Sequence, residues 1–555
     1  MNGAKMFYRL NRDTPESELS PGSGQSFPGS APGSSPPSTT FGGSDQTSPY
    51  LAEYTHQRIY VAVILLVALV LRLYRLSSQS IWVDEMLTLS SSGITAPLNP
   101  IDIFDNLHGP LHSMIMFLWV RLAGEGEFAL RLPSVTFSVL SMLAIYRLVL
   151  KLSGPRTAAV ALSVMALSPF HIWYGQEARN YSMLLFFSAM SFGSFLSLLS
   201  EPGRNNFGKY VLFTLAGFLS NMSMAFVVIV QDIFFLFYPR KLSFRSLALA
   251  HVFLLLLLLP WLTGMLQRVE FHRLARTIPY AKSEFLRGET TFTPFALPYT
   301  FFVFSVGYSL GPSLRELHES TQLANLARHA PVLIPAAVGF SLVFLFGIIS
   351  LRKSKRLLLL LLVWMALPIA IVSLFAIKNF KPFNPRYVMV SYPAYVLLLA
   401  EGLRFRKEAV KRVVIRLVVA VLVLVTMLVS LWNYYEAVDY GKDDFRSAAH
   451  TLGAEFNEGD VVFTEGTYEP LIYYLRHSGE LITFLPLFSE TIGDDNVLKN
   501  YVLERSQEAK RVWLVESRLW NLDPDKKTEA LFRQVFIVEK EFRFRGVDLI
   551  LLSKK

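Results

Sequence analysis

Long runs of apolar residues recur along this chain and limit the folds that it can adopt. Each run has about the 20 residues that a helix needs to cross the hydrocarbon core of a bilayer, or nearly so. Strict two-residue alternation is absent from the runs, which argues against an outer-membrane barrel. The runs predict about eleven membrane-spanning helices, at residues 58–76, 132–151, 157–174, 181–199, 209–222, 223–238, 245–263, 329–350, 357–377, 387–403 and 412–434.

The composition agrees with a polytopic α-helical membrane protein. Hydrophobic residues make up 52% of the 555 residues and charged residues only 17%, whereas a soluble domain carries about 25% charged residues. The chain has no cysteine, so disulfides, cysteine-bound zinc and iron–sulfur clusters are excluded. Its net charge is +10, but basic residues beside membrane helices usually report topology. We therefore expect no nucleic acid among its partners.

Basic clusters between the predicted spans indicate the orientation of the chain. With eleven spans, these clusters all fall on one side if residues 109–124 lie along the membrane surface instead of crossing it. That segment has a short apolar core and begins with Gly-Pro, which suits an interfacial helix. Because Lys and Arg collect in cytoplasmic loops, we expect a cytoplasmic N-terminus. The clusters are at residues 151–156, 204–209, 240–245, 352–356 and 404–412.

Three regions follow from this pattern. Residues 1–50 are rich in Ser, Pro and Gly and predict a disordered cytoplasmic tail. Residues 51–435 form the transmembrane domain, with outer loops at 77–131 and 264–328. Residues 436–555 predict a small extracytoplasmic α/β domain, which we expect to cover the outer site or to hold an acceptor. Its predicted strands are 460–464, 511–517, 535–542 and 547–553.

Polar residues from separated segments fall on the outer face in this topology. The stretch SSQSIWVDEMLTLSSSG at 77–93 places Asp84 and Glu85 just after the first span. The same face receives His108, His112, YGQEARNY at 174–181 and KNFKPFNPRY at 378–387. We expect these segments to converge on one polar site at one membrane surface.

Several of these stretches resemble a known family. LRLYRLSSQSIWVDEMLTL, NLHGPLHSMIMFLW, ALSPFHIWYGQEARNYSMLLF and NPRYVMVSYPAYVLLLAEGL resemble the bacterial protein O-mannosyltransferase-like glycosyltransferases, relatives of the lipid A aminoarabinose transferases. The resemblance covers roughly residues 58–475 and departs from the family pattern at Gly109, where a proline is common. It implies a GT-C fold in the bacterial cytoplasmic membrane. It also implies inverting transfer of a hexose or pentose from a polyprenyl-phosphate sugar to an extracytoplasmic acceptor.

The implied chemistry assigns Asp84 and Glu85 to catalysis. An acceptor hydroxyl is a weak nucleophile and needs a positioned general base, for which Asp84 is the candidate. The leaving group is a phosphate, which departs without a proton if cations stabilise it, so one base is sufficient. Adjacent side chains on a helix point about 100° apart. We therefore expect Glu85 to support the site, either by orienting Asp84, by bonding to the backbone or by binding a metal.

The remaining candidates bind the donor or a metal. Arg179 is the first choice for the donor phosphate and Arg386 the second, because a guanidinium matches phosphate in a bidentate geometry. His108 and His112 either contact phosphate or, speculatively, ligate a divalent metal. Further residues expected at the mouth of the site are Gln176, Glu177 and Tyr181.

The sequence leaves other functions open. A lipid-linked oligosaccharide polymerase or transferase of the same fold is the nearest alternative. A transporter or flippase would use Asp232, a carboxylate inside an apolar run, and an inactive scaffold for envelope assembly is a third reading. The acceptor is a protein, lipid A, another glycolipid or a polysaccharide, and the sequence does not distinguish among them.

Overall fold

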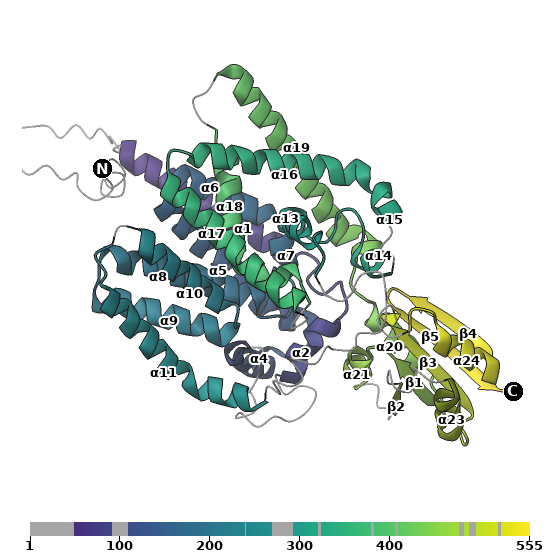
Figure 1. Ribbon diagram of the computed structural model, residues 1–555. Helices are drawn as coiled ribbons and strands as arrows, with labels where there is room; N and C mark the ends of the chain where they lie inside the picture. The colour runs from purple at the N-terminus through teal and green to yellow at the C-terminus, as the bar shows by residue number, and fades with distance from the viewer. Residues whose placement is uncertain are drawn as a thin grey trace, which may run out of the picture. The chain divides into compact units, whose positions relative to one another are not determined.

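The computed structural model describes most of the chain (Figure 1). The described residues are 49–91, 109–238, 240–268, 292–319, 323–378, 382–405, 409–476, 482–487, 495–519 and 523–555. Residues Ile64–Lys555 form one compact unit, and every contact below lies within it. The other unit, Met1–Val63, is described only from residue 49 onward, as part of helix α1. The predicted tail therefore lies almost wholly outside the described residues.

The described residues contain seven helices that are long and apolar enough to cross a membrane. An eighth span exists if the bent pair α6 (Pro155–Leu167) and α7 (Pro169–Gly175) is counted as one. The chain is thus a multi-pass membrane protein. The seven helices are α1 (Pro49–Leu73), α5 (Glu127–Ser153), α8 (Tyr181–Ser200), α11 (Phe244–Arg268), α16 (Ala330–Leu351), α17 (Lys355–Ile377) and α19 (Val410–Glu436).

The other predicted spans are helical but shorter. Residues 209–222 and 223–238 correspond to α9 (Arg204–Ser220) and α10 (Met224–Phe237), and 387–403 is divided between η1 (Pro385–Ser391) and α18 (Tyr392–Leu403). Thus every predicted span coincides with helix, although fewer than eleven have the length to cross alone. The break before α18 coincides with Pro393 in its first turn, because proline has no N–H for the helical hydrogen bonds.

Short helices lie between the spans in the loops predicted to be outer. Helix α4 (Pro110–Ala123) has 14 residues, too few to cross, as expected for the segment placed along the membrane surface. Helix α2 (Val83–Ser91) carries the acidic pair. The apolar helix α13 (Ala296–Val306) was not expected within the loop 264–328. It is followed by α14 (Leu314–Glu319) and α15 (Leu323–Arg328).

A buried arginine stabilises the bend between α6 and α7. The two helices meet at 62° before Pro169, whose ring cannot continue the helical hydrogen bonding. The carbonyls of Met165 and Ala166 are left at the end of α6, and Arg72 donates to them at 3.1 and 3.4 Å. Arg72 also contacts His171 Nδ1 at 2.6 Å. This bend fixes where the chain leaves α7, and the next residues enter the polar site.

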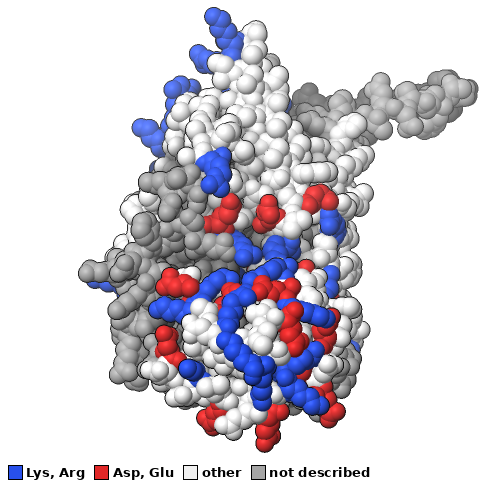
Figure 2. Space-filling view, turned by 90° about the vertical axis from the view of Figure 1, so that its right-hand side faces the viewer, with Lys and Arg blue, Asp and Glu red and all other residues white. Residues whose placement is uncertain are grey.

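The helical surface suits a lipid environment. Figure 2 shows a wide area over the helices with few charged side chains, and a dense mixture of basic and acidic side chains over the C-terminal domain. In water such an apolar area would be costly, whereas in a bilayer it faces hydrocarbon. Exposed apolar side chains include Leu66, Val70, Leu249, Leu255, Leu256, Val414, Val418 and Val421.

The C-terminal domain is a five-stranded mixed sheet in the order β2-β1-β3-β5-β4. The strand β1 is parallel to β2 and β3, while β5 is antiparallel to β3 and β4. The four predicted strands are confirmed, and β2 is additional. The strands are β1 (Val461–Glu465), β2 (Phe484–Leu487), β3 (Arg511–Ser517), β4 (Phe536–Phe544) and β5 (Val547–Lys554).

Helices cover both faces of this sheet. One apolar core packs α20 (Phe445–Glu455) and α21 (Glu469–Leu475) against it, and the other packs α23 (Asp495–Arg505) and α24 (Lys527–Val535). The sheet domain is connected to α19 by η2 (Val438–Tyr440) and the residues that follow it. These connecting residues lie beside the polar site.

Candidate functional site

Helix α2 turns its two carboxylates in different directions. Asp84 and Glu85 lie in its first turn, where the partial positive charge of a helix N-terminus favours acidic residues. The side chain of Glu85 is fully buried, whereas that of Asp84 remains 17% exposed. Only Asp84 can therefore be reached from outside the protein without a rearrangement.

Three groups from other parts of the chain hold Glu85. Arg131 on α5 donates from Nε to Oε1 at 2.8 Å and from Nη2 to Oε2 at 2.7 Å. The backbone N–H of Ala178 donates to Oε1 at 2.9 Å, and Lys442 Nζ lies 3.5 Å from Oε2. Burial raises the pKa of Glu85, but the charges of Arg131 and Lys442 outweigh it and bring the pKa to about 2. Glu85 is thus an ionised anchor with both oxygens occupied.

Asp84 pairs with Arg386, which is more than 300 residues away in the sequence. Arg386 donates from Nη1 to Asp84 Oδ2. It is placed by η1, whose first turn is capped because the Asn384 side chain accepts the backbone N–H of Arg386 at 3.1 Å. The Nε of Arg386 has no hydrogen-bond partner among the described residues. The guanidinium therefore holds Asp84 and keeps a donor available for another anion.

The segment after α7 contributes a structural residue and an unpaired acid. The Gln176 amide donates to the carbonyls of Arg72 and Tyr74, each at 2.8 Å, and so caps the end of α1. The Glu177 side chain is 1% exposed, and neither of its oxygens accepts a hydrogen bond within the described part of the chain. Gln176 thus has its amide engaged in the fold, whereas Glu177 has both oxygens available.

The electrostatic surroundings of Glu177 combine both signs of charge. Burial raises its pKa, the charge of Lys442 lowers it, and the nearby Asp84 and Glu85 raise it, so that the pKa is about 7. A carboxyl with a pKa near neutrality in a cleft is a common feature of functional sites. Asp84, Glu85 and Glu177 are called the acid cluster below.

Arg179 is a second cation directed at this site. Its side chain is mostly buried, and its guanidinium makes no hydrogen bond or ion pair to any described residue. It lies 5.9 Å from the ring centre of Tyr181. The charges of Arg179 and Arg386 both act on the Tyr181 hydroxyl, so both guanidinium groups lie in its neighbourhood. Tyr174 and Tyr308, whose hydroxyls lie 2.8 Å apart, belong to the same wall.

The predicted histidines do not form a metal centre with the other described residues. His108 lies outside the described part of the chain. His112 is buried on α4 with an unpaired Nε2, and burial together with the charge of Arg179 lowers its pKa to about 3. Within the described residues, His and acidic side chains form no group of three able to hold a metal ion. The charge of Arg179 acts on His112, and a cation there disfavours a second one.

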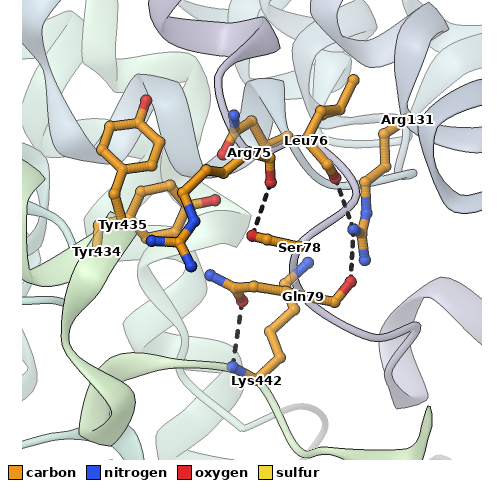
Figure 3. Close-up of a pocket in the computed structure, with 9 residues that line it drawn as sticks. Arg75, Leu76, Ser78, Gln79, Arg131, Tyr434, Tyr435 and Lys442 are labelled. Atoms are coloured by element: carbon orange, nitrogen blue, oxygen red, sulfur yellow. Dashed lines mark hydrogen bonds between the residues drawn. The ribbon is translucent and has the colours of Figure 1, made fainter.

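Two residues at the site were missed from the sequence. Arg131 lies in EFALRLPSV at the start of α5, and its Nη groups also donate to the carbonyls of Leu76, Gln79 and Ser80. Lys442 belongs to the connection after α19, where its backbone N–H donates to Gln79 Oε1 at 3.2 Å. Figure 3 shows the two side chains around the turn at 75–79. Arg131 lies directly before the predicted span 132–151, and an arginine at the edge of a span was a signal because such residues are rarely unpaired; Lys442 had no comparable signal.

Asp232, the residue of the transporter alternative, is elsewhere in the helical domain. It lies on α10 and its Oδ1 is 3.5 Å from Nε2 of His251 on α11. None of its contacts in the described structure involves the acid cluster. Its role in transport stays a prediction.

The buried pair of Glu85 and Arg131 leads to a testable stability prediction. We expect Glu85→Gln and Arg131→Met each to destabilise the protein by about 3–5 kcal/mol, because each leaves an uncompensated buried charge. The double variant should cost less than the sum of the two. Because the pKa of Glu85 is lowered, its contribution is present above pH 4.5 and is lost as the pH falls towards 2. Thermal unfolding in detergent measures the stability of each variant, with exposed Glu458→Gln as the control. Additive losses of stability in the double variant would contradict the predicted coupling.

Comparison with known proteins gives one family match and several similar structures. Residues 107–263 match the family model described as dolichyl-phosphate-mannose-protein mannosyltransferase. No curated protein matches the sequence. Among solved structures, ArnT from Cupriavidus metallidurans in the apo state has a TM-score of 0.57 at 13% identity, covering 90% of this chain and 98% of that chain.

Two ligand-bound structures are also similar. ArnT from Cupriavidus metallidurans bound to undecaprenyl phosphate gives a TM-score of 0.55 at 13% identity, covering 89% of this chain and 98% of that one. The archaeal oligosaccharyltransferase AglB from Archaeoglobus fulgidus, in complex with an inhibitory peptide and a dolichol-phosphate, gives 0.52 at 11% identity, with 90% and 74% covered. The expected fold and resemblance are confirmed: this chain has the GT-C fold of these glycosyltransferases, and residues 107–263 carry the sequence pattern of the mannosyltransferase family.

Proposed function

We propose that this protein transfers a hexose or pentose from a polyprenyl-phosphate donor to an extracytoplasmic acceptor hydroxyl, with inversion. The observation that carries the proposal is a reachable carboxylate, Asp84, paired with the guanidinium of Arg386, while the charges of Arg386 and Arg179 both act on the nearby Tyr181. A displacement at a sugar carbon with a phosphate leaving group needs both a base and cations.

The proposed site for the donor phosphate is beside Tyr181, within the influence of both guanidinium groups. Similar structures hold undecaprenyl phosphate and dolichol-phosphate, which supports a lipid phosphate as the ligand here. Arg179 has its guanidinium unpaired, and Arg386 has its Nε unpaired, among the described residues. Guanidinium groups bind phosphate oxygens in a bidentate geometry. The Tyr181 hydroxyl, on which both charges act, is a further donor for the same phosphate.

Asp84 is the better placed of the two available carboxylates to act as base. Its side chain is partly exposed, whereas that of Glu177 lies within the wall of the site. In the free protein Arg386 occupies Asp84. When the donor phosphate attracts that guanidinium, Asp84 is freed to accept the proton of the acceptor hydroxyl. The hydroxyl oxygen then forms the new bond to the sugar carbon as the bond to the phosphate oxygen breaks.

Glu177 is suited to hold the donor sugar. Its two oxygens have no hydrogen bond within the described residues, and it lies near Asp84 and Arg386. A buried carboxylate without donors is costly, and sugar hydroxyls would supply the missing donors. This proposal gives Glu177 a binding role and leaves proton transfer to Asp84.

The acceptor and the cellular setting belong to the same proposal. The acceptor is a protein, lipid A, another glycolipid or a polysaccharide, each of which offers a hydroxyl. The protein lies in a bacterial cytoplasmic membrane with its N-terminus inside, and the polar site and C-terminal domain face outward. Within this fold, the alternative function is transfer of a lipid-linked oligosaccharide, and the likeness to AglB supports that alternative. A panel of lipid-linked monosaccharides and oligosaccharides as donors distinguishes it from monosaccharide transfer.

Removal of the Asp84 carboxylate tests its role as the base. Asp84→Asn should reduce single-turnover transfer by roughly 10²–10⁴-fold, because the amide cannot take the acceptor proton. Thermal unfolding should change little, since the Asp84 side chain is partly exposed. Release of free polyprenyl phosphate from purified donor measures the rate. Exposed Asp525→Asn serves as the matched control. Retention of most of the activity by the Asp84 variant would remove it as the base.

Another prediction concerns the donor phosphate. Arg179→Ala should weaken binding of undecaprenyl phosphate by about 10–100-fold, which corresponds to a charge-assisted hydrogen bond of about 1.5–3 kcal/mol. Arg179→Lys should recover only part of the affinity because it lacks the planar fork. Arg121→Ala, which removes an exposed arginine packed on Phe117 of α4, is the control. Equal affinities of the Arg179→Ala variant and wild type would exclude a phosphate contact.

A further prediction concerns metal dependence. The hypothesis of a divalent metal includes His108, which lies outside the described residues. The described residues themselves offer no group of three metal ligands. Stabilisation of the leaving phosphate by Arg179 and Arg386 would make a metal unnecessary. We therefore expect transfer to persist at an unchanged rate after exhaustive chelation. Loss of activity that one added divalent metal restores would show instead that a metal is required.

A further inference from the structure

Lys442 is a buried cation inside the polar site, although it belongs to the connection to the C-terminal domain. Its side chain is 2% exposed, and its Nζ lies 3.5 Å from Glu85 Oε2. The ammonium group is 5.3 Å from the ring centre of Trp82 and 5.9 Å from that of Trp173. A lysine is rarely buried unless it is paired, and here a carboxylate and two aromatic faces provide the pairing.

The sheet domain fixes the backbone on both sides of Lys442. Arg545, in the turn between β4 and β5, donates from Nε to the Lys442 carbonyl at 2.6 Å and from Nη1 to the Val438 carbonyl at 2.9 Å. The carbonyl of Arg545 accepts the N–H of Asp444 at 2.7 Å. The next residue is Gly546 at φ +75°, where a Cβ would lie 2.1 Å from an Asp443 carboxylate oxygen. This turn therefore approaches the 438–444 connection too closely for any larger residue.

A second set of contacts joins the domain to the start of α5. Arg446 on α20 pairs with Glu127, and Arg476 after α21 pairs with Glu125. The Tyr473 hydroxyl donates to the Glu125 carbonyl at 2.6 Å. These residues line a groove of about 520 Å³. The domain thus contacts both the connection carrying Lys442 and the start of α5.

We propose that the C-terminal domain completes the polar site by supplying Lys442, a positioning residue that keeps the acid cluster in its charged arrangement. The inference rests on the proposed function, because it assigns this role to the site of transfer. Lys442 does not act on the reacting atoms; it acts through Glu85 and Glu177. In this proposal the domain contributes directly to transfer, beyond covering the site or holding an acceptor.

The charges that face Glu177 explain why Lys442 matters. Next to burial, the Lys442 charge has the largest influence on the Glu177 carboxyl, and it favours the ionised form. Without it, the pKa of Glu177 would rise above about 7, so the group would be protonated at neutral pH. The other titratable and charged groups that face this pair are Asp84, Glu85, Arg131, Tyr174, Tyr181, Tyr308, Arg386 and Tyr434.

The test is a double-variant cycle on the full-length protein. Lys442→Met should lower kcat by about 10²-fold, the size expected for a misplaced catalytic group, and should move the acid limb of the pH–rate profile to higher pH. Lys442→Arg, which keeps the charge, should recover most of the rate. Arg545→Ala should cause a smaller loss with the same pH shift, because it loosens the connection. Arg533→Ala on α24, an exposed arginine of the same domain, should leave the rate and the profile unchanged.

The combined variant decides whether the domain acts through Lys442. If it does, Lys442→Met with Arg545→Ala is no slower than Lys442→Met alone. Independent, multiplying losses would overturn the proposal, as would an unchanged rate or pH profile in Lys442→Met. If Lys442→Met does not fold, the pH profile of Arg545→Ala decides: a shifted acid limb supports the proposal and an unshifted one overturns it.

A separate readout distinguishes this inference from the proposed function. If the wild-type protein transfers sugar from none of the lipid-linked donors, the proposed function is wrong. Wild type, Lys442→Met, Arg545→Ala and the combined variant are then compared by thermal unfolding. Non-additive stabilities of the Lys442 and Arg545 changes support the coupling between domain and site, and additive ones overturn it.

Discussion

The polar site depends on the buried ion pair between Glu85 and Arg131. Isolated in a protein interior, either charge would cost several kcal/mol, and removal of one partner transfers that cost to the other. Here the pair is satisfied completely, since Arg131 also donates to three carbonyls of the turn at 76–80 and Glu85 accepts the N–H of Ala178. One interaction therefore fixes the turn after α1, the start of α2 and the segment after α7. Asp84 and Glu177 take their positions from these elements.

Much of the fold could be predicted from the sequence because the length of an apolar run is a strong signal for a membrane-spanning helix. Each predicted span coincides with helix, and the strands at 511–517 and 547–553 agree with β3 and β5. The exceptions have local physical causes. Proline breaks 157–174 into α6 and α7, and the short helix α13 lies in a loop whose apolar stretch is below spanning length.

The candidate site was predicted in part, and the limits are equally physical. The spacing of spans predicts that Asp84, Glu177, Arg179 and Arg386 share one face. In the structure Arg386 pairs with Asp84, the charges of both act on Glu177, and Arg179 lies near Tyr181. Spacing alone does not show which carboxylate is buried, so the different surroundings of Asp84 and Glu85 required the packing of α2. Lys442 was not anticipated because it follows the last span, in a stretch whose composition resembles any polar connection. Its place depends on Arg545, about a hundred residues later.

The balance of charge in the site matches the reaction proposed for it. Three carboxylates, Asp84, Glu85 and Glu177, face the four cations Arg131, Arg179, Arg386 and Lys442. Glu85 is paired with Arg131 and also lies near Lys442. The remaining positive charge is therefore that of Arg179 and Arg386. A sugar phosphodiester brings one negative charge there, and its departure as a phosphate monoester adds another. In the proposed reaction the excess cation would thus lie where negative charge grows in the transition state, which is the condition under which fixed charges accelerate a reaction.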